Sequence, residues 1–196
     1  MSLLVQRSLS SKKPEQNATT PVNLHRPLYI EKVDRKDYEL IAHIAKDWAS
    51  IAQKKMSITD NTEERWAWEE LISCRVIADS IADTVEDDSP DCEQMYVCKE
   101  IVSEKIYGIA VGFQNNEMIH GSFLVTHPHN IRCKANRSES LRVKGVGTAF
   151  IKFVEEECKK QSKTLYFVPQ TSAEPFYQKF GYIEGKNSKS TPASKL

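Results

Sequence analysis

The pattern of apolar residues along the chain predicts two helices followed by a set of strands. Apolar side chains recur every three or four positions over 38–51 and again over 68–76, which is the spacing of one buried helix face. Over 95–98, 106–113 and 118–125 they instead alternate or run together, with short polar turns between the runs. These three runs predict an antiparallel meander.

The rest of the pattern places this meander in a mixed α/β (α+β) fold. The further expected elements are a strand over 28–33, a helix over 145–161, a strand over 165–168, a short helix over 173–180 and a strand around Tyr182. The order predicts a mixed, mostly antiparallel sheet flanked by about four helices. No strand pattern follows Tyr182, so the last strand is expected to be shortened or missing. A poor strand over 186–194 and a second copy of the chain that completes the edge, making a homodimer, remain alternatives.

Length and composition favour one domain, over 28–185, between flexible tails at 1–27 and 186–196. Lys plus Arg and Asp plus Glu both number 27, so no nucleic-acid or membrane partner is expected. No apolar run approaches the roughly 20 residues that span a bilayer. The five scattered cysteines form no C-x-x-C pair and indicate reduced thiols in a cytoplasmic protein. An organelle transit peptide in the basic, hydroxyl-rich leader is the alternative.

The most informative segment is Arg142-Val143-Lys144-Gly145-Val146-Gly147-Thr148, which opens the helix expected from 145. The first turn of a helix has unpartnered N–H groups and a positive dipole end, and glycines let a bulky anion approach them. A phosphate site is therefore expected here. A dinucleotide fingerprint would need a third glycine at Phe150, and a P-loop would need Gly-Lys followed by Ser or Thr; both patterns are absent.

Two motifs together resemble the GNAT (GCN5-related N-acetyltransferase) superfamily. Residues 142–147 match its R/Q-x-x-G-x-G/A signature, and residues 173–182 match its A-x-x-F-Y-x-K-x-G-F/Y ending in the correct order. The resemblance spans roughly 28–182, and it implies the GNAT fold and acetyl-CoA as cosubstrate. The segment His129 to Leu141, which includes Arg132, Lys134 and Arg137, is longer than in many members. It either covers the cofactor or is a solvated insertion.

The resemblance also implies roles for individual residues. The backbone amides over 143–148 would hold the pyrophosphate, those of Leu124 and Val125 would meet the acetyl carbonyl and pantetheine arm, and Tyr177 would protonate the leaving thiolate. A buried core tyrosine is the alternative for Tyr177. Gln170 stands where the family often has Asn. The expected cofactor-binding residues are Leu124, Val125, Arg142, Val143, Lys144, Gly145, Val146, Gly147, Thr148 and Gln170.

The acceptor amine must lose a proton before it attacks, because an alkylammonium has a pKa of about 10.4. Candidate bases are Glu117, His120 and His127, of which His120 and His127 are the stronger, although a lone histidine on a strand is often structural. The H-x-H formed by His127 and His129 lacks further ligands, so no metal is expected. Trp48, Trp66 and Trp68 are expected in the core or in the wall of an acceptor pocket.

These features predict an enzyme, an N-acetyltransferase that moves acetyl from acetyl-CoA to an amine of a small molecule or peptide. Direct attack within a ternary complex is the expected route. The alternative is a non-catalytic module that binds acetyl-CoA or a protein partner. The acids Asp79, Asp83, Glu86, Asp87 and Asp88 could attract a cationic acceptor, but no run of residues specifies that acceptor.

Overall fold

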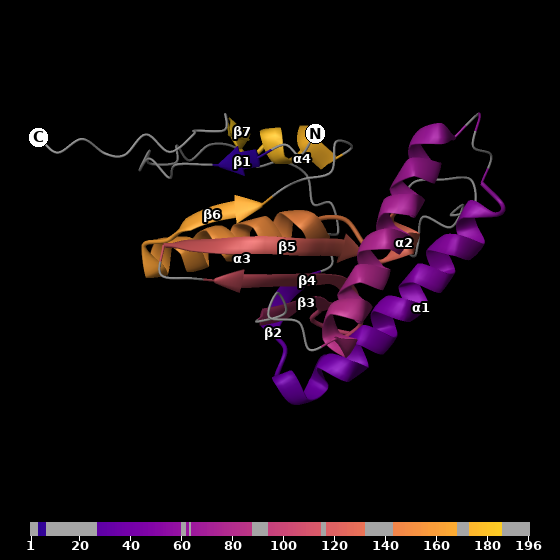
Figure 1. The fold of residues 1–196 in the computed structure, drawn as a ribbon, viewed down its shortest axis with the longest axis horizontal. Helices are drawn as coiled ribbons and strands as arrows, with labels where there is room; N and C mark the ends of the chain where they lie inside the picture. The colour runs from indigo at the N-terminus through magenta and orange to yellow at the C-terminus, as the bar shows by residue number, and fades with distance from the viewer. Residues whose placement is uncertain are drawn as a thin grey trace, which may run out of the picture.

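The computed structural model describes residues 4–6, 27–59, 62, 64–87, 94–114, 117–131, 143–167 and 173–185. Their elements are shown in Figure 1. In chain order these are β1 (Leu4–Gln6), β2 (Leu28–Lys32), η1 (Arg35–Asp37), α1 (Tyr38–Met56), α2 (Arg65–Glu86), β3 (Gln94–Glu100), β4 (Ile106–Gln114), β5 (Met118–Thr126), η2 (Pro128–Asn130), α3 (Val146–Gln161), β6 (Thr164–Phe167), α4 (Glu174–Gln178) and β7 (Ile183–Gly185).

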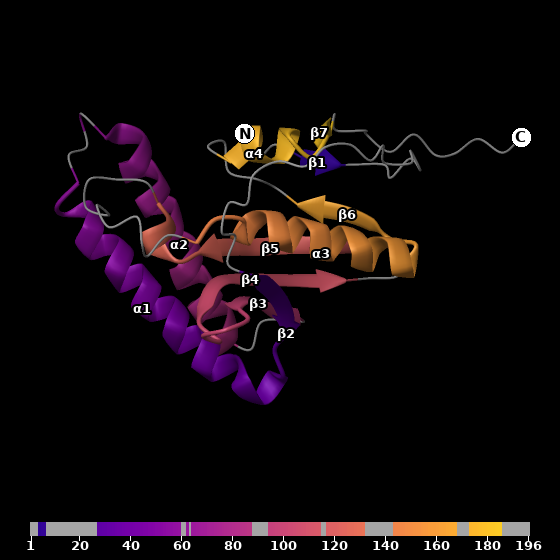
Figure 2. The same cartoon turned by 180° about the vertical axis from the view of Figure 1, so that it is seen from behind.

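The strands form one mixed sheet in the order β2-β3-β4-β5-β6-β1-β7. Every neighbouring pair is antiparallel except β5 and β6, which run parallel. Helix α3 lies along one face of the sheet, and the hairpin of α1 and α2 packs on the other face near one end (Figures 1 and 2). The predicted mixed, mostly antiparallel fold is confirmed, and all six expected strands are present.

The hairpin of α1 and α2 is held together by small residues. Ala45 and Ala52 of α1, and Ala78 and Ala82 of α2, are completely buried in one apolar cluster with Leu71. Alanine favours the helix and lets two helix axes approach closely, so large side chains are kept for the contact with the sheet. The same cluster includes Ile109 and Val125 from the strands, which fixes the hairpin against β4 and β5.

Helix α3 sits directly on the backbone of β4. A Cβ atom at Gly108 would lie 2.5 Å from Val146 Cγ1 and 2.6 Å from Phe150 Cε2, so only glycine allows this contact. Val146 is the first residue of α3, and both apolar side chains are buried. The sheet therefore fixes the position of the N-terminus of α3.

The N-terminal segment differs from its prediction. Residues 4–6, expected within a flexible tail, form β1 and pair on both sides, with Val5 opposite Phe167 of β6 and Glu184 of β7. The prediction of a tail is wrong at these three residues, because pairing on both edges offsets the weak strand signal of so short a run. The expected tail at 186–196 lies outside the described residues. Among the described strands, β1 is the seventh strand of the sheet, and it comes from the N-terminal segment and not from the C-terminal sequence.

Candidate active site

The site begins where β5 and β6 separate. Their parallel pairing runs from Met118 opposite Thr164 to Gly121 opposite Phe167, where β6 ends. Strand β5 continues to Thr126, so its last part has no partner on this side among the described residues. Unpaired strand edges present free N–H and C=O groups that a ligand can meet.

A β-bulge lies at the point of separation. Val111 pairs with Phe123 while Gly112 pairs with Gly121, so Ser122 is an extra residue in β5. A Cβ atom at Gly112 would lie 2.4 Å from the carbonyl oxygen of His120, so glycine is needed at this register shift. Bulges bend a strand and re-aim its side chains, which is consistent with the strand leaving β6 here.

The peptide groups of β5 alternate in direction beyond the bulge. The N–H of His127 donates to the carbonyl oxygen of Tyr107 at 2.9 Å, continuing the ladder to β4. Alternation then turns the peptide groups of Val125 toward β4 and those of Leu124 and Thr126 toward the open edge. The Leu124 amide is thus at the edge, whereas the Val125 amide faces β4 and its side chain is buried.

The N-terminus of α3 has the features of an anion site. Gly145 occupies the N-cap with φ 91°, and no side chain caps the helix in the part of the chain that the structure describes. The N–H of Ala149 donates to the carbonyl oxygen of Gly145 at 2.8 Å, which starts the helical ladder. The preceding amides, those of Val146, Gly147 and Thr148, belong to the first turn, which has no intrahelical acceptor.

Four other predicted cofactor residues stand differently. The N–H of Val143 donates to Asn130 Oδ1 at 3.0 Å, so this amide is already used within the protein. Lys144 is exposed next to the N-cap. Arg142 and Gln170, as well as Arg132, Lys134 and Arg137, lie outside the described residues. The anion site on the described residues therefore begins after Val143.

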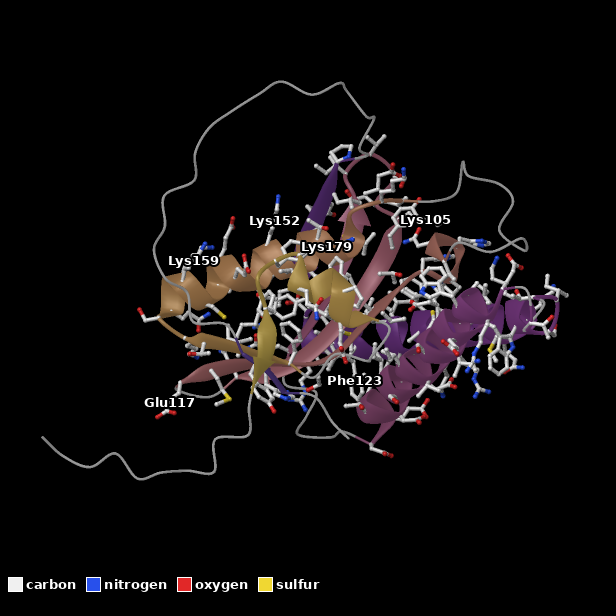
Figure 3. The ribbon with its side chains drawn as sticks, turned by 90° about the horizontal axis from the view of Figure 1, so that it is seen from above. Lys105, Glu117, Phe123, Lys152, Lys159 and Lys179 are labelled. Carbon is white, nitrogen blue, oxygen red and sulfur yellow. The ribbon has the colours of Figure 1, made fainter. Side chains whose placement is uncertain are left out.

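A cavity of about 640 Å³ connects the open edge, α3 and the two faces of the sheet. Leu124, Gly147 and Tyr177 line it on the side of α3 and α4, and Glu70 and Ile77 line it from α2. In Figure 3 the labelled Phe123, which also lines the cavity, lies where the sheet meets α2. The cavity joins the helix N-terminus to a second compartment under α2.

Tyr177 lies in the cavity wall within an aromatic group. Its ring centroid is 4.3 Å from that of Phe167 and 5.1 Å from that of Phe176. Burial raises the pKa of its phenol to about 12, so the hydroxyl keeps its proton at physiological pH. A hydroxyl in this state can donate a proton, although it is a weaker acid than that of an exposed tyrosine.

His120 lines the cavity on the side of α2. Its neighbour Ile119 packs into the cluster between the sheet, α3 and α4, and adjacent side chains of a strand point to opposite faces. The ring of His120 stacks on Tyr166 with centroids 4.9 Å apart, and its Nδ1 lies 3.3 Å from Ser122 Oγ. It is the candidate base that the structure brings to the cavity together with Tyr177.

The other two candidate bases lie elsewhere. His127 is buried, its ring centroid is 5.0 Å from that of Trp48, and its Nδ1 accepts from the backbone N–H of His129 at 3.2 Å, which caps η2. It is not among the cavity-lining residues, and burial with nearby positive groups lowers its pKa to about 4. Glu117 is exposed at the opposite end of β5 (Figure 3).

The comparison with family models identifies the part of the chain that carries both motifs. Residues 137–191 match the model described as an acetyltransferase (GNAT) domain. Over this segment the chain is similar to the GNAT acetyltransferase family. The resemblance drawn from residues 142–147 and 173–182 is confirmed, since the matched GNAT segment contains both.

Two solved structures are similar to the chain at low identity. A Trypanosoma brucei acetyltransferase is 15% identical, with a TM-score of 0.41, and the match covers 85% of this chain and 99% of that one. Glucosamine-6-phosphate N-acetyltransferase from Arabidopsis thaliana is 18% identical, with a TM-score of 0.37, covering 87% and 98%. No curated protein gives a significant match. Similarities of this strength do not bear on the activity of the chain.

Apart from Trp66, the sequence did not single out the residues on the side of the cavity that α2 forms. Cys74 and Val76 line this side together with five residues at spacings of four and three: Trp66, Glu70, Ser73, Ile77 and Ser80. Of the three tryptophans expected in the core or a pocket wall, Trp48 is buried in the core and Trp66 lines the cavity. This stripe mixes charged, hydroxyl and apolar residues, so the sequence alone does not mark it as a helix face. Its helical spacing next to the buried stripe is the signal that could have identified it.

The described residues hold no cluster of three or more His, Cys, Asp or Glu suited to a metal ion. His127 and His129 do stack, with ring centroids 4.8 Å apart. Within the same residues, none of the helices has the length and apolar character needed to cross a bilayer.

Proposed function

We propose that this chain is an acetyl-CoA-dependent N-acetyltransferase that acts by direct attack of an amine within a ternary complex. The observation that carries the proposal is the continuous path from the uncapped N-terminus of α3, along the open edge of β5, to a cavity lined by both Tyr177 and His120. Such a path fits a long, bent cofactor with an anionic group at one end and the reacting thioester at the other.

The described residues fit the two ends of acetyl-CoA separately. The first-turn amides of Val146, Gly147 and Thr148 would bind the diphosphate, with Lys144 adding positive charge. The open edge of β5 would pair with the pantetheine arm as a short added strand, and the outward-facing Leu124 amide would meet the acetyl carbonyl. Arg142 and Gln170 lie outside the described residues, and their binding of the cofactor stays a prediction from the sequence.

The chemistry then needs three proton transfers. His120, directly or through a water, takes a proton from the ammonium so that the free amine can attack the acetyl carbon. A C–N bond forms and the C–S bond breaks, while the Leu124 amide stabilises the charge on the carbonyl oxygen. Tyr177 donates its proton to the departing thiolate, and the new amide nitrogen releases its second proton to water, which returns a proton to Tyr177. Its phenol is protonated across the physiological range, so the proton is always in place.

The experiment is a thiol-release assay with acetyl-CoA over a panel of amines, using Tyr177→Phe and His120→Gln. We expect Tyr177→Phe to lower kcat roughly 10²-fold, the usual contribution of a general acid, while acetyl-CoA affinity measured by calorimetry stays the same. His120→Gln should lower kcat/KM for the amine in the same way. Tyr29→Phe on β2, which is not a cavity-lining residue, is the matched control.

Unchanged turnover in Tyr177→Phe would remove its assigned role. Binding of acetyl-CoA without thiol release for any amine would instead support the alternative, a module that binds the cofactor without catalysis.

A further inference from the structure

The compartment of the cavity under α2 has a chemistry of its own. The stripe formed by Trp66, Glu70, Ser73, Ile77 and Ser80 runs along the cavity face of the helix at spacings of four and three residues. The adjacent stripe, which includes Ala67, Leu71 and Ala78, is buried against α1. Helix α2 thus packs with one stripe and presents the next one to whatever occupies the cavity.

The charge of this compartment has one sign. Among the described cavity-lining residues, Glu70 is the one carboxylate and there is no lysine or arginine. The remaining walls are largely apolar, which strengthens the field of a charge inside the cavity. A cationic amine is attracted to Glu70, whereas a phosphate or carboxylate on the acceptor would find repulsion and no positive partner among these residues.

The walls around Glu70 supply apolar surface. Trp66 is 56% exposed at the rim, although large aromatic side chains are usually more buried. Ile77, about two helical turns beyond Glu70, and Phe123 from β5 continue this surface into the cavity. Exposed aromatic surface next to a cavity is typical of a ligand site, because the ligand completes its burial.

We infer that the acceptor is a primary amine on an aromatic or other apolar body without phosphate or carboxylate groups. Glu70 draws in the ammonium group, and Trp66, Ile77 and Phe123 bind the body. The inference rests on the proposed acetyl transfer and names its substrate class. The cavity of about 640 Å³ also holds the cofactor arm, and it lies within the range of about 300–1,000 Å³ common for small-molecule sites. A small amine therefore fits better than a folded protein segment.

The first test compares four amines. 2-Phenylethylamine and phenylalanine differ in one group, a carboxylate; spermidine lacks the apolar body, and glucosamine 6-phosphate lacks it and carries a phosphate. We expect kcat/KM for 2-phenylethylamine to exceed that of each of the other three at least tenfold. An equal or higher value for any of the three overturns the proposed substrate class.

The second test changes the charge of the compartment. Glu70→Gln should raise the KM for 2-phenylethylamine about tenfold and leave the KM for acetyl-CoA unchanged, and Glu70→Asp should restore part of the loss. Glu69→Gln is the matched control, since Glu69 is outside the cavity lining and pairs with Arg65 at 2.9 Å. An unchanged amine KM in Glu70→Gln contradicts the role of Glu70. The amine panel on the unmodified protein gives an answer even if this variant does not fold.

Failure of this inference and failure of acetyl transfer give different results. Preferred turnover of the amino acid, the polyamine, the sugar phosphate or a peptide overturns the apolar-amine class and leaves the transferase standing. Bound acetyl-CoA with no thiol released for any amine overturns the transferase itself.

Discussion

At the scale of single residues, two histidines of the same strand region have different environments. His120 lines the cavity, next to Ser122 Oγ, and His127 is enclosed by Trp48 and Tyr107. Both are equally plausible bases in the sequence, because residue type and position on a strand do not reveal which ring reaches open space. The structure assigns His127 to capping η2 through the backbone N–H of His129.

The buried His127 predicts a pH dependence of stability. Its pKa falls from 6.5 to about 4 through burial first and then through His129, Lys105 and Lys55. The unfolded chain binds this proton more readily than the folded chain does. Above pH 6.5 His127 is neutral in both states, so it does not lower the free energy of unfolding. Stability is then lost as the pH falls from about 6.5 to 4, by up to about 3 kcal/mol. Urea unfolding of the wild type across this range measures the loss.

His127→Gln should flatten that part of the stability curve, because glutamine does not titrate. His43→Gln, on the exposed face of α1, should leave the pH slope as it is in the wild type. A slope of the same size in His127→Gln would show that another group is responsible.

The two glycines at the start of α3 serve different purposes, and alanine at each separates them. At Gly145 no atom lies within 4 Å of a new Cβ, but φ is 91°, so alanine should cost about 1–2 kcal/mol of stability through backbone strain. At Gly147 the Cβ would lie 3.0 Å from Phe176 Cζ, and Phe176 contacts Tyr177. We expect Gly147→Ala to lower kcat more than Gly145→Ala does, and Gly145→Ala to lower the thermal stability more than Gly147→Ala does. The opposite order in kcat and in thermal stability would refute this division.

At the scale of elements, a hydrogen bond connects the segment after α4 to α3. The hydroxyl of the buried Tyr182 donates to Glu155 Oε1 at 2.9 Å, joining the segment after α4 to the middle of the long helix. Removing the hydroxyl leaves a charged acceptor with one partner fewer. Tyr182→Phe should therefore lower the free energy of unfolding by about 1.5–3 kcal/mol, measured by urea denaturation. A loss below about 0.5 kcal/mol would mean that water replaces the phenol.

The elements show which parts of the fold the sequence can reveal. Long periodic segments gave α1, α2, α3 and the meander of β3, β4 and β5, since many residues contribute to each pattern. The motifs over 142–148 and 173–182 led to the α3 N-terminus and to Tyr177. The three residues of β1 are too few to carry a period, and their pairing partners lie about 160 residues away. The Asn130 bond to Val143 is likewise a long-range contact that no local pattern predicts.

At the scale of the whole molecule, β1 brings the N-terminal segment into the sheet next to the strand that supports Tyr177. It lies between β6 and β7, and β6 carries Phe167, whose ring packs against that of Tyr177. Strands β1 and β2 are five positions apart in the sheet, or about 24 Å at the usual strand spacing. The 21 residues from 7 to 27 can extend roughly 70 Å, so a single chain spans this distance easily.

Strand β1 should therefore support both stability and turnover. Val5→Pro removes an N–H group from a strand that has neighbours on both sides, so the lost bond affects the sheet whichever way that group points. We expect a loss of at least about 1 kcal/mol, a fall in Tm of a few degrees, and a lower kcat with unchanged acetyl-CoA affinity, because Phe167 holds Tyr177 less firmly. Val5→Thr keeps the N–H and the β-branch and should behave like the wild type.

If Val5→Pro matches Val5→Thr in both Tm and kcat, β1 does not form part of the working sheet. If its Tm depends on protein concentration, the strand comes from a second copy of the chain, because only exchange between copies makes the pairing bimolecular.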